Sequence, residues 1–109
     1  MPDLTSIPLN ELTRQHFEPA IGTSFEIPFD DGSVHQLELN DTRDVFAGGG
    51  PNEQQRKPFA LSFLGAKDKY VKQGIYPLRH SEFGTLSLFI VPLGPDRASG
   101  RIQYEAIFT

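Results

Sequence analysis

The sequence predicts an all-β protein, a small antiparallel barrel or sandwich of about six strands with one short N-terminal helix. The first observation behind this prediction is a period-two alternation, clearest in Gly84–Pro95, where Leu86, Leu88 and Ile90 share one face of an expected strand. The second is the regular spacing of turn signals, such as Asp30–Ser33, between short alternating stretches. Short strands separated by turns are typical of both architectures, so the choice between barrel and sandwich stays open.

The size of the chain indicates one domain. Its 109 residues are enough for a single hydrophobic core. We expect residues 1–11 to be a proline-containing lead-in and residues 12–109 to form the β domain. Hydrophobic residues make up 38% of the chain, and nine phenylalanines with no tryptophan indicate a core built mainly from phenylalanine.

Charge and residue counts exclude several classes of function. The net charge is −4 and no cluster of basic residues is present, which argues against binding to nucleic acid or to anionic membrane surfaces. The absence of cysteine excludes disulfides, thiolate catalysis and cysteine-ligated metals. No apolar run approaches the roughly 18 residues of a membrane span, and the N-terminus lacks the pattern of a signal peptide. We therefore expect a cytoplasmic protein with no membrane contact.

A short helix is expected at Thr13–Glu18. Thr13 is a suitable N-cap, and Pro19 ends the helix because it disfavours helical backbone at the residue before it. The apolar side chains around this helix are expected to form a small plug, made of Leu12, Phe17 and Ile21.

Two strands joined by a hairpin turn are expected next. Ser24–Phe29 alternates with Phe25 and Ile27 inward, and Pro28 indicates a strand end or a sheet edge. The Asp-Gly pair in the turn favours the positive φ angle of hairpin turns. The second strand is expected at Val34–Asp44.

The longest loop is expected at Ala47–Lys57, which is polar and rich in glycine. Its three consecutive glycines, Gly48, Gly49 and Gly50, lack the Lys-Ser/Thr ending of a phosphate-binding loop, so they do not predict a nucleotide site. We interpret them as a mobile segment that contacts a partner.

The remaining strands are expected at Phe59–Phe63, Gly74–His80, Gly84–Pro95 and Arg101–Thr109. The strand that begins at Gly84 is the most apolar, so we place it centrally in its sheet. Its outer face becomes apolar at Phe89 and Val91, and we expect this half to be covered on both faces. Because proline cannot donate to the strand ladder, we expect the ladder to end from Pro92 to Pro95.

The sequence shows no pattern that predicts catalysis or metal binding. A zinc site would need the distant His16, His35 and His80 to meet with a fourth ligand. His80 and Glu82 are a close histidine–carboxylate pair, and we interpret them as hydrogen-bonding groups at a turn. Glu82 and Glu105 are candidate carboxylates for glycosidase chemistry, but nothing places them together. We expect no metal, no cofactor and no enzymatic activity.

Four aromatic residues are not easily assigned to one core, and we treat them as candidate partner contacts: Tyr70, Tyr76, Phe83 and Phe89. Exposed aromatic side chains form surfaces for proteins or sugars. The alternative for all four is packing within the core.

Several segments carry a family resemblance: FEP at 17–19 with Gly22, PFALSF at 58–63, GIYPLRH at 74–80, FG at 83–84, LFIVPLGP at 88–95 and YEAIF at 104–108. In residue types and spacing they resemble a family of small bacterial all-β domains of unknown function, over residues 12–109. The resemblance implies no catalytic or cofactor residues. It implies an accessory or assembly role linked to phage-tail-like systems. The matching positions are mostly apolar, glycine or proline, which specify fold rather than chemistry.

Three functions follow as hypotheses. The first is a non-enzymatic protein-binding or assembly module that docks a partner protein or a second copy, with open edge strands near Pro28 or Pro77. The alternative is a β-barrel that binds a small molecule or carbohydrate, with Tyr70, Tyr76 or Phe83 at its mouth. A hydrolase is the remote alternative, and it would need at least two titratable groups in one cleft.

Overall fold

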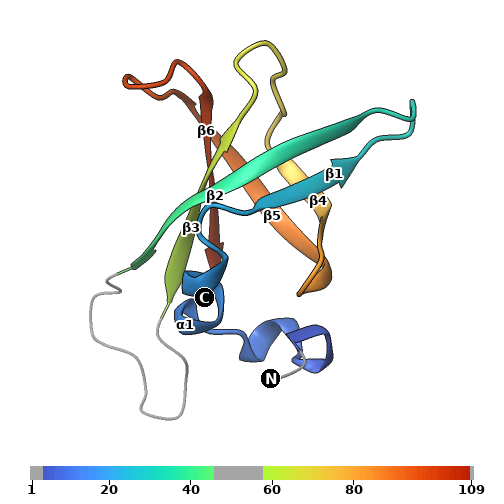
Figure 1. Ribbon diagram of the computed structural model, residues 1–109, viewed down its shortest axis with the longest axis vertical. Helices are drawn as coiled ribbons and strands as arrows, with labels where there is room; N and C mark the ends of the chain where they lie inside the picture. The colour runs from blue at the N-terminus through green and yellow to red at the C-terminus, as the bar shows by residue number, and fades with distance from the viewer. Residues whose placement is uncertain (1–3, 46–57, 109) are drawn as a thin grey trace.

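The computed structural model describes residues 4–45 and 58–108, which form a closed barrel of six antiparallel strands with a helical N-terminal segment (Figure 1). The expected all-β class is confirmed, and the architecture is a barrel rather than a sandwich. The strands are β1 Ser24–Pro28, β2 Val34–Asp44, β3 Phe59–Gly65, β4 Gly74–His80, β5 Gly84–Pro95 and β6 Ile102–Phe108. The helical segment consists of 3₁₀ helices Leu4–Ser6 and Leu9–Glu11, helix α1 Arg14–Phe17 and 3₁₀ helix Glu18–Ala20.

The strands follow the order β1-β2-β3-β6-β5-β4 around the barrel, and β4 returns to β1. The closing contact is narrow, since Glu26 of β1 and Arg79 of β4 form the one register pair between these strands in the described chain. The expectation of open edge strands is wrong. Pro28 lies opposite Val34 at the end of β1, and Pro77 lies opposite Ser87 of β5, in strands that the barrel closure joins at that register pair.

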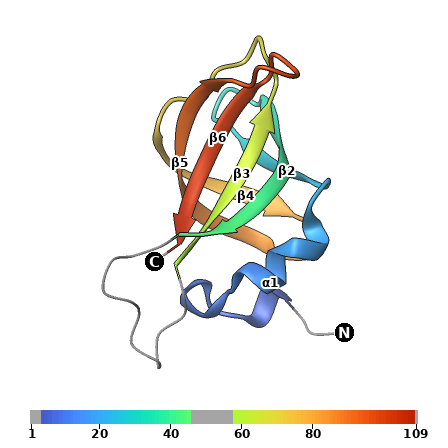
Figure 2. The same cartoon turned by 90° about the vertical axis from the view of Figure 1, so that its left-hand side faces the viewer.

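The two ends of the barrel differ. Figure 2 shows the helical segment with α1 at one end, which we call the helical end. The connections from β3 to β4 and from β5 to β6 lie at the opposite end, which we call the loop end. Among the described residues, the helices are too short and too polar to cross a membrane.

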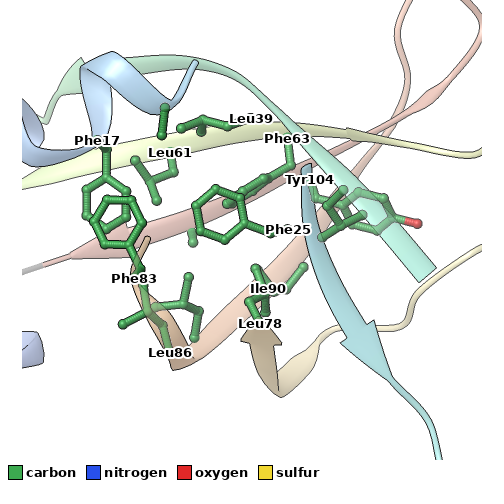
Figure 3. Packing of buried hydrophobic residues seen from close by; sticks show 14 of the residues in the cluster. Phe17, Phe25, Leu39, Leu61, Phe63, Leu78, Phe83, Leu86, Ile90 and Tyr104 are labelled. Carbon is green, nitrogen blue, oxygen red and sulfur yellow. The ribbon is translucent and has the colours of Figure 1, made fainter. Parts of the chain in front are cut away.

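The core is rich in phenylalanine, as the composition indicates. Phe17 of α1 stacks on Phe83 with ring centroids 4.5 Å apart, and Phe25 packs edge-on against Phe63 at 5.5 Å. Figure 3 shows that Phe17 and Phe83 lie at one end of this core and Tyr104 at the other. The helical segment therefore closes one end of the barrel with aromatic rings.

The expected apolar plug is correct for two of its three residues. Leu12 and Phe17 are buried, but Ile21 is 42% exposed. The reason is the 3₁₀ helix Glu18–Ala20 that follows α1, because it turns the chain so that Ala20 faces the core instead.

Strand β5 has a neighbour on each side, β4 and β6, but it differs from the sequence-based expectation in two respects. The ladder does not end at Pro92. It continues to Pro95 through a register shift between Pro92 and Gly94, which accommodates residues that cannot donate a backbone hydrogen bond. The outer face is also not covered, since Phe89 is 48% exposed. The helical segment lies at an end of the barrel, and only Leu9 of it, in the described chain, borders Phe89 in one shallow depression.

Candidate functional site

An apolar strip crosses the outer wall of the barrel over β4, β5 and β6. Its three residues are Ile75, Phe89 and Ile107, which are 73%, 48% and 53% exposed. Ile75 and Phe89 are direct register partners on neighbouring strands. Phe89 and Ile107 line one shallow depression of about 190 Å³. We call these three residues the β5 strip.

The charges beside the β5 strip are already paired with each other. Strand β5 contains no charged residue. On one side Arg43 forms an ion pair with Glu105 of β6. On the other, Arg79 of β4 lies 3.7 Å from the carboxylate of Glu26. The strip is thus an uncharged surface bordered by neutralised pairs.

A second feature is a pocket at the loop end of the barrel, which we call the mouth pocket. Its volume is about 520 Å³. Strand β2 supplies one wall, the connection between β3 and β4 supplies the other, and Arg101 lies at the border. The lining residues are Val34, His35, Gln36, Leu37, Ala66, Asp68, Lys69, Val71 and Arg101.

Tyr104 fixes the connection that forms one wall of the mouth pocket. The backbone N–H of Val71 donates to the Tyr104 hydroxyl oxygen at 2.8 Å, and the hydroxyl donates to the carbonyl oxygen of Lys69 at 3.3 Å. Tyr104 is fully buried, and burial raises the pKa of its phenol above the ordinary value of 10.0. The phenol therefore keeps its proton at neutral pH and remains a donor.

The polar groups of the mouth pocket differ in how they are held. The guanidinium of Arg101 donates to Glu38 at 2.9 Å and to the carbonyl oxygen of Leu64 at 3.0 Å. Lys69 has no ion pair in the described part of the chain. The Nδ1 atom of His35 is buried and has no hydrogen-bond partner among the described residues, which is an unusual state for a buried polar atom.

A third feature is a polar hollow where β1 meets β4. Its volume is about 570 Å³, and its floor includes a row of register partners that runs across four strands from Gln36 through Glu26 and Arg79 to Thr85. Among the described residues, its lining includes no phenylalanine or tyrosine on which a sugar ring could stack. This composition does not favour the carbohydrate-binding hypothesis at this hollow.

His80 borders the polar hollow, but its ring is fully engaged. Its Nε2 lies 2.8 Å from the Thr23 hydroxyl, and its Nδ1 accepts the backbone N–H of Glu82 at 3.0 Å. Burial lowers the pKa of His80 below the ordinary 6.5, although the nearby Glu82 carboxylate opposes this effect. The interpretation of His80 and Glu82 as hydrogen-bonding groups at a turn agrees with this geometry.

The candidate partner contacts are placed differently by the structure. Phe89 lies in the β5 strip, and Tyr70 is 60% exposed in the connection after β3. Tyr76 is half-buried and donates its hydroxyl to the carbonyl oxygen of Lys72 at 2.7 Å. Phe83 is a correction, because it is buried in the core and offers no surface to a partner. Gly48, Gly49 and Gly50 lie outside the described residues.

Sequence reasoning missed several residues of these features. Ile107 was not named as a contact, although the alternation along β6 places it on the outer face and is a signal for this member of the strip. The mouth pocket has no such signal, because Lys69 and Arg101 come from separate connections. Among the described residues, no three histidine or acidic side chains gather at a place that could hold a metal ion.

These observations define a small closed β-barrel domain with an apolar strip on its wall and a pocket at its loop end. A protein-family model, the domain of unknown function DUF6916, matches residues 12–108, so the chain belongs to this family. No curated protein and no solved structure matches the chain significantly. The family description assigns no activity, and function is therefore argued from the geometry of the surface.

Proposed function

We propose that the chain is a non-enzymatic assembly module that binds a second copy of itself through the β5 strip. The observation that carries this proposal is the contiguity of Ile75, Phe89 and Ile107 on three neighbouring strands. Single exposed apolar residues are common on protein surfaces, but a contiguous uncharged patch is typical of an interaction site.

A second copy is the occupant that the charges favour. The chain has a net charge of −4, so most faces of two copies repel each other. The β5 strip avoids this repulsion because its neighbouring charges, Arg43 with Glu105 and Arg79 with Glu26, are already paired. Two strips that meet across a twofold axis bring apolar side chains together without an unpaired charge. The strip is small, so we expect a weak complex.

The absence of enzymatic activity is part of the proposal. Its support is that both ring nitrogens of His80, two residues before Glu82, hold structural hydrogen bonds and are not available as a general base. The link to phage-tail-like systems that the sequence resemblance implies agrees with an assembly role. That link stays a prediction.

The test is the oligomeric state of the purified chain by sedimentation equilibrium, from low micromolar to millimolar concentration. We expect the wild type to move toward a dimer as its concentration rises. Phe89→Lys places a charge in the centre of the strip and should leave only monomer. Tyr70→Lys is the matched control, because Tyr70 is an equally accessible aromatic outside the strip.

Two outcomes would overturn the proposal. A wild type that stays monomeric at millimolar concentration has no self-association, and a different occupant of the strip would then have to be considered. Equal loss of dimer in Tyr70→Lys and Phe89→Lys would show that the interface lies elsewhere or depends on net charge. Circular dichroism of each variant establishes that the barrel is intact.

A further inference from the structure

We infer that the mouth pocket binds a small organic anion that has an apolar body, such as an aromatic sulfonate or carboxylate. This inference is independent of the β5 strip, because the pocket lies at the loop end on β2 and the connection after β3. It rests on the shape of the pocket, on its charges and on one buried atom without a partner.

The shape and walls of the pocket suit a small molecule. A volume of about 520 Å³ lies within the range of small-molecule sites in proteins, roughly 300 to 1,000 Å³. Val34 supplies exposed apolar surface, and the buried side chains of Leu37 and Val71 lie in the walls behind it. Pockets of this kind bind a ligand body by apolar contact and orient it with a few polar groups.

One cation in the pocket lining, Lys69, favours an anionic ligand. Lys69 and Arg101 are the cationic residues of the lining and Asp68 is its one carboxylate, in a chain whose net charge is −4. Glu38 already pairs with Arg101 outside the lining. Lys69, which has no ion pair in the described part of the chain, is therefore the cation that we assign to the ligand.

His35 supplies the second polar contact. Its ring lines the pocket and packs against Phe29 with centroids 4.4 Å apart, while its Nδ1 is buried without a hydrogen-bond partner among the described residues. A buried ring nitrogen without a partner is unfavourable, so a turn of the ring that brings Nδ1 to the pocket and lets a ligand group bond to it is stabilised. The rival explanation is an ordered water at the same nitrogen.

The pocket is also preorganised. Tyr104 holds both Lys69 and Val71 by their backbone groups, and Arg101 is fixed by Glu38 and by the carbonyl oxygen of Leu64. The wall that carries Lys69 is thus attached to the buried core on one side. A rigid wall lowers the entropy that a ligand must lose on binding.

The probe for the test is anilinonaphthalene sulfonate, an aromatic anion whose fluorescence rises when it enters an apolar site. We expect saturable binding, accompanied by NMR shifts of the amides of Val34, Ala66 and Val71 and of the imidazole nitrogens of His35. The uncharged analogue phenylnaphthylamine has nearly the same apolar body without the sulfonate. It should bind at least about tenfold more weakly, since it lacks a charge-assisted contact.

Three variants locate the site. Lys69→Glu should weaken binding of the sulfonate by about tenfold or more, because it reverses the charge that we assign to the ligand. Lys67→Glu makes the same change of net charge in the same connection but outside the lining, so its affinity should equal that of the wild type. His35→Phe keeps an aromatic ring, removes both nitrogens and should also weaken binding.

The inference would be overturned by any of three results. NMR shifts confined to residues of the β5 strip would show that the dye binds this strip and not the mouth pocket. Equal affinities of Lys69→Glu and Lys67→Glu would show only a general effect of charge. His35 nitrogens that do not respond to saturating sulfonate would indicate that a water satisfies Nδ1, and that the pocket binds nothing through it.

Discussion

The Nε2 atom of His80 lies 2.8 Å from the hydroxyl oxygen of Thr23, and this contact joins β4 to the segment that enters β1. The Thr23 hydroxyl donates to the carbonyl oxygen of Ala20 at 2.6 Å, so it accepts its hydrogen bond from His80. The Nδ1 of His80 accepts the backbone N–H of Glu82. Only a neutral imidazole with its proton on Nε2 satisfies all three hydrogen bonds.

This arrangement predicts that the protein loses stability in mild acid. Burial lowers the pKa of His80 in the folded state, whereas the unfolded chain keeps the ordinary value of 6.5. The unfolded state therefore binds more protons below that pH, and the free energy of unfolding falls as pH drops through about 6.5. One proton contributes a slope of at most about 1.4 kcal/mol per pH unit. Urea unfolding between about pH 5 and pH 8 measures this slope.

A variant separates His80 from the other titrating groups. His80→Gln is expected to be less stable at neutral pH but to show a flatter pH dependence than the wild type, because the residue at this position no longer titrates. The Glu82 carboxylate, whose charge acts on the pKa of His80, is retained in the variant. Parallel curves for the two proteins between pH 5 and 8 would contradict the assignment to His80.

Local features of the fold were predictable from the sequence. The bounds of β2 and β4 agree with the alternating patterns at Val34–Asp44 and Gly74–His80, because alternation and turn residues act between neighbours in the chain. Barrel closure was not predictable. It depends on one pairing, Glu26 with Arg79, between strands far apart in the sequence, and no local pattern encodes such a contact.

The candidate site was predictable only in part. Phe89 was a candidate partner contact, although its half of the strand was expected to be covered on both faces. The core position of Phe83 depends on Phe17, an aromatic partner from a distant helix. The mouth pocket depends on Lys69 and His35 being brought together at one end of the barrel. Such convergence is a property of the three-dimensional fold and leaves no spacing in the sequence.

Tyr104→Phe is predicted to lower the free energy of unfolding by about 1–3 kcal/mol. The substitution keeps the ring in the core but removes the hydroxyl that accepts the Val71 N–H, which then remains buried without a partner. Chemical denaturation measures the change. Hydrogen exchange should also accelerate at the Val71 amide more than in the strands, because the connection loses its attachment to β6.

Tyr76→Phe is the matched control for Tyr104→Phe. The Tyr76 hydroxyl also donates to a backbone carbonyl, that of Lys72, but it does so near the surface, where water replaces a lost hydrogen bond. We expect a change within about 0.5 kcal/mol. Similar losses in both variants would mean that the buried position of Tyr104 has no special effect.

Gly65→Ala is predicted to lower the free energy of unfolding by about 1–3 kcal/mol through overpacking. A Cβ atom at Gly65 would lie 2.8 Å from Cε2 of Tyr104 and 2.9 Å from Cδ2 of Leu37, both in the core. Gly74→Ala is the control, since its Cβ would lie 3.4 Å from the half-buried ring of Tyr76. A Gly65→Ala protein as stable as Gly74→Ala would show that the core yields easily beside β3.

Phe17→Ala is predicted to lower the free energy of unfolding by about 3–5 kcal/mol, as for other buried phenylalanines. Phe17 stacks on Phe83 at 4.5 Å and lies 5.4 Å from Phe108, so its removal leaves a cavity between a ring of the β4–β5 turn and a ring of β6. Ile21→Ala is the control in the same N-terminal segment, and its partial exposure predicts a much smaller loss.

Comparing Phe17→Ala with Ile21→Ala decides whether the helical segment unfolds cooperatively with the barrel core. Thermal unfolding followed at the strands, by circular dichroism, should shift to lower temperature in Phe17→Ala and hardly at all in Ile21→Ala. If Phe17→Ala instead detaches the helical segment while the barrel unfolds at the wild-type temperature, the barrel is stable without the packing of Phe17. In that case Phe83 and Phe108 must repack against each other at the helical end.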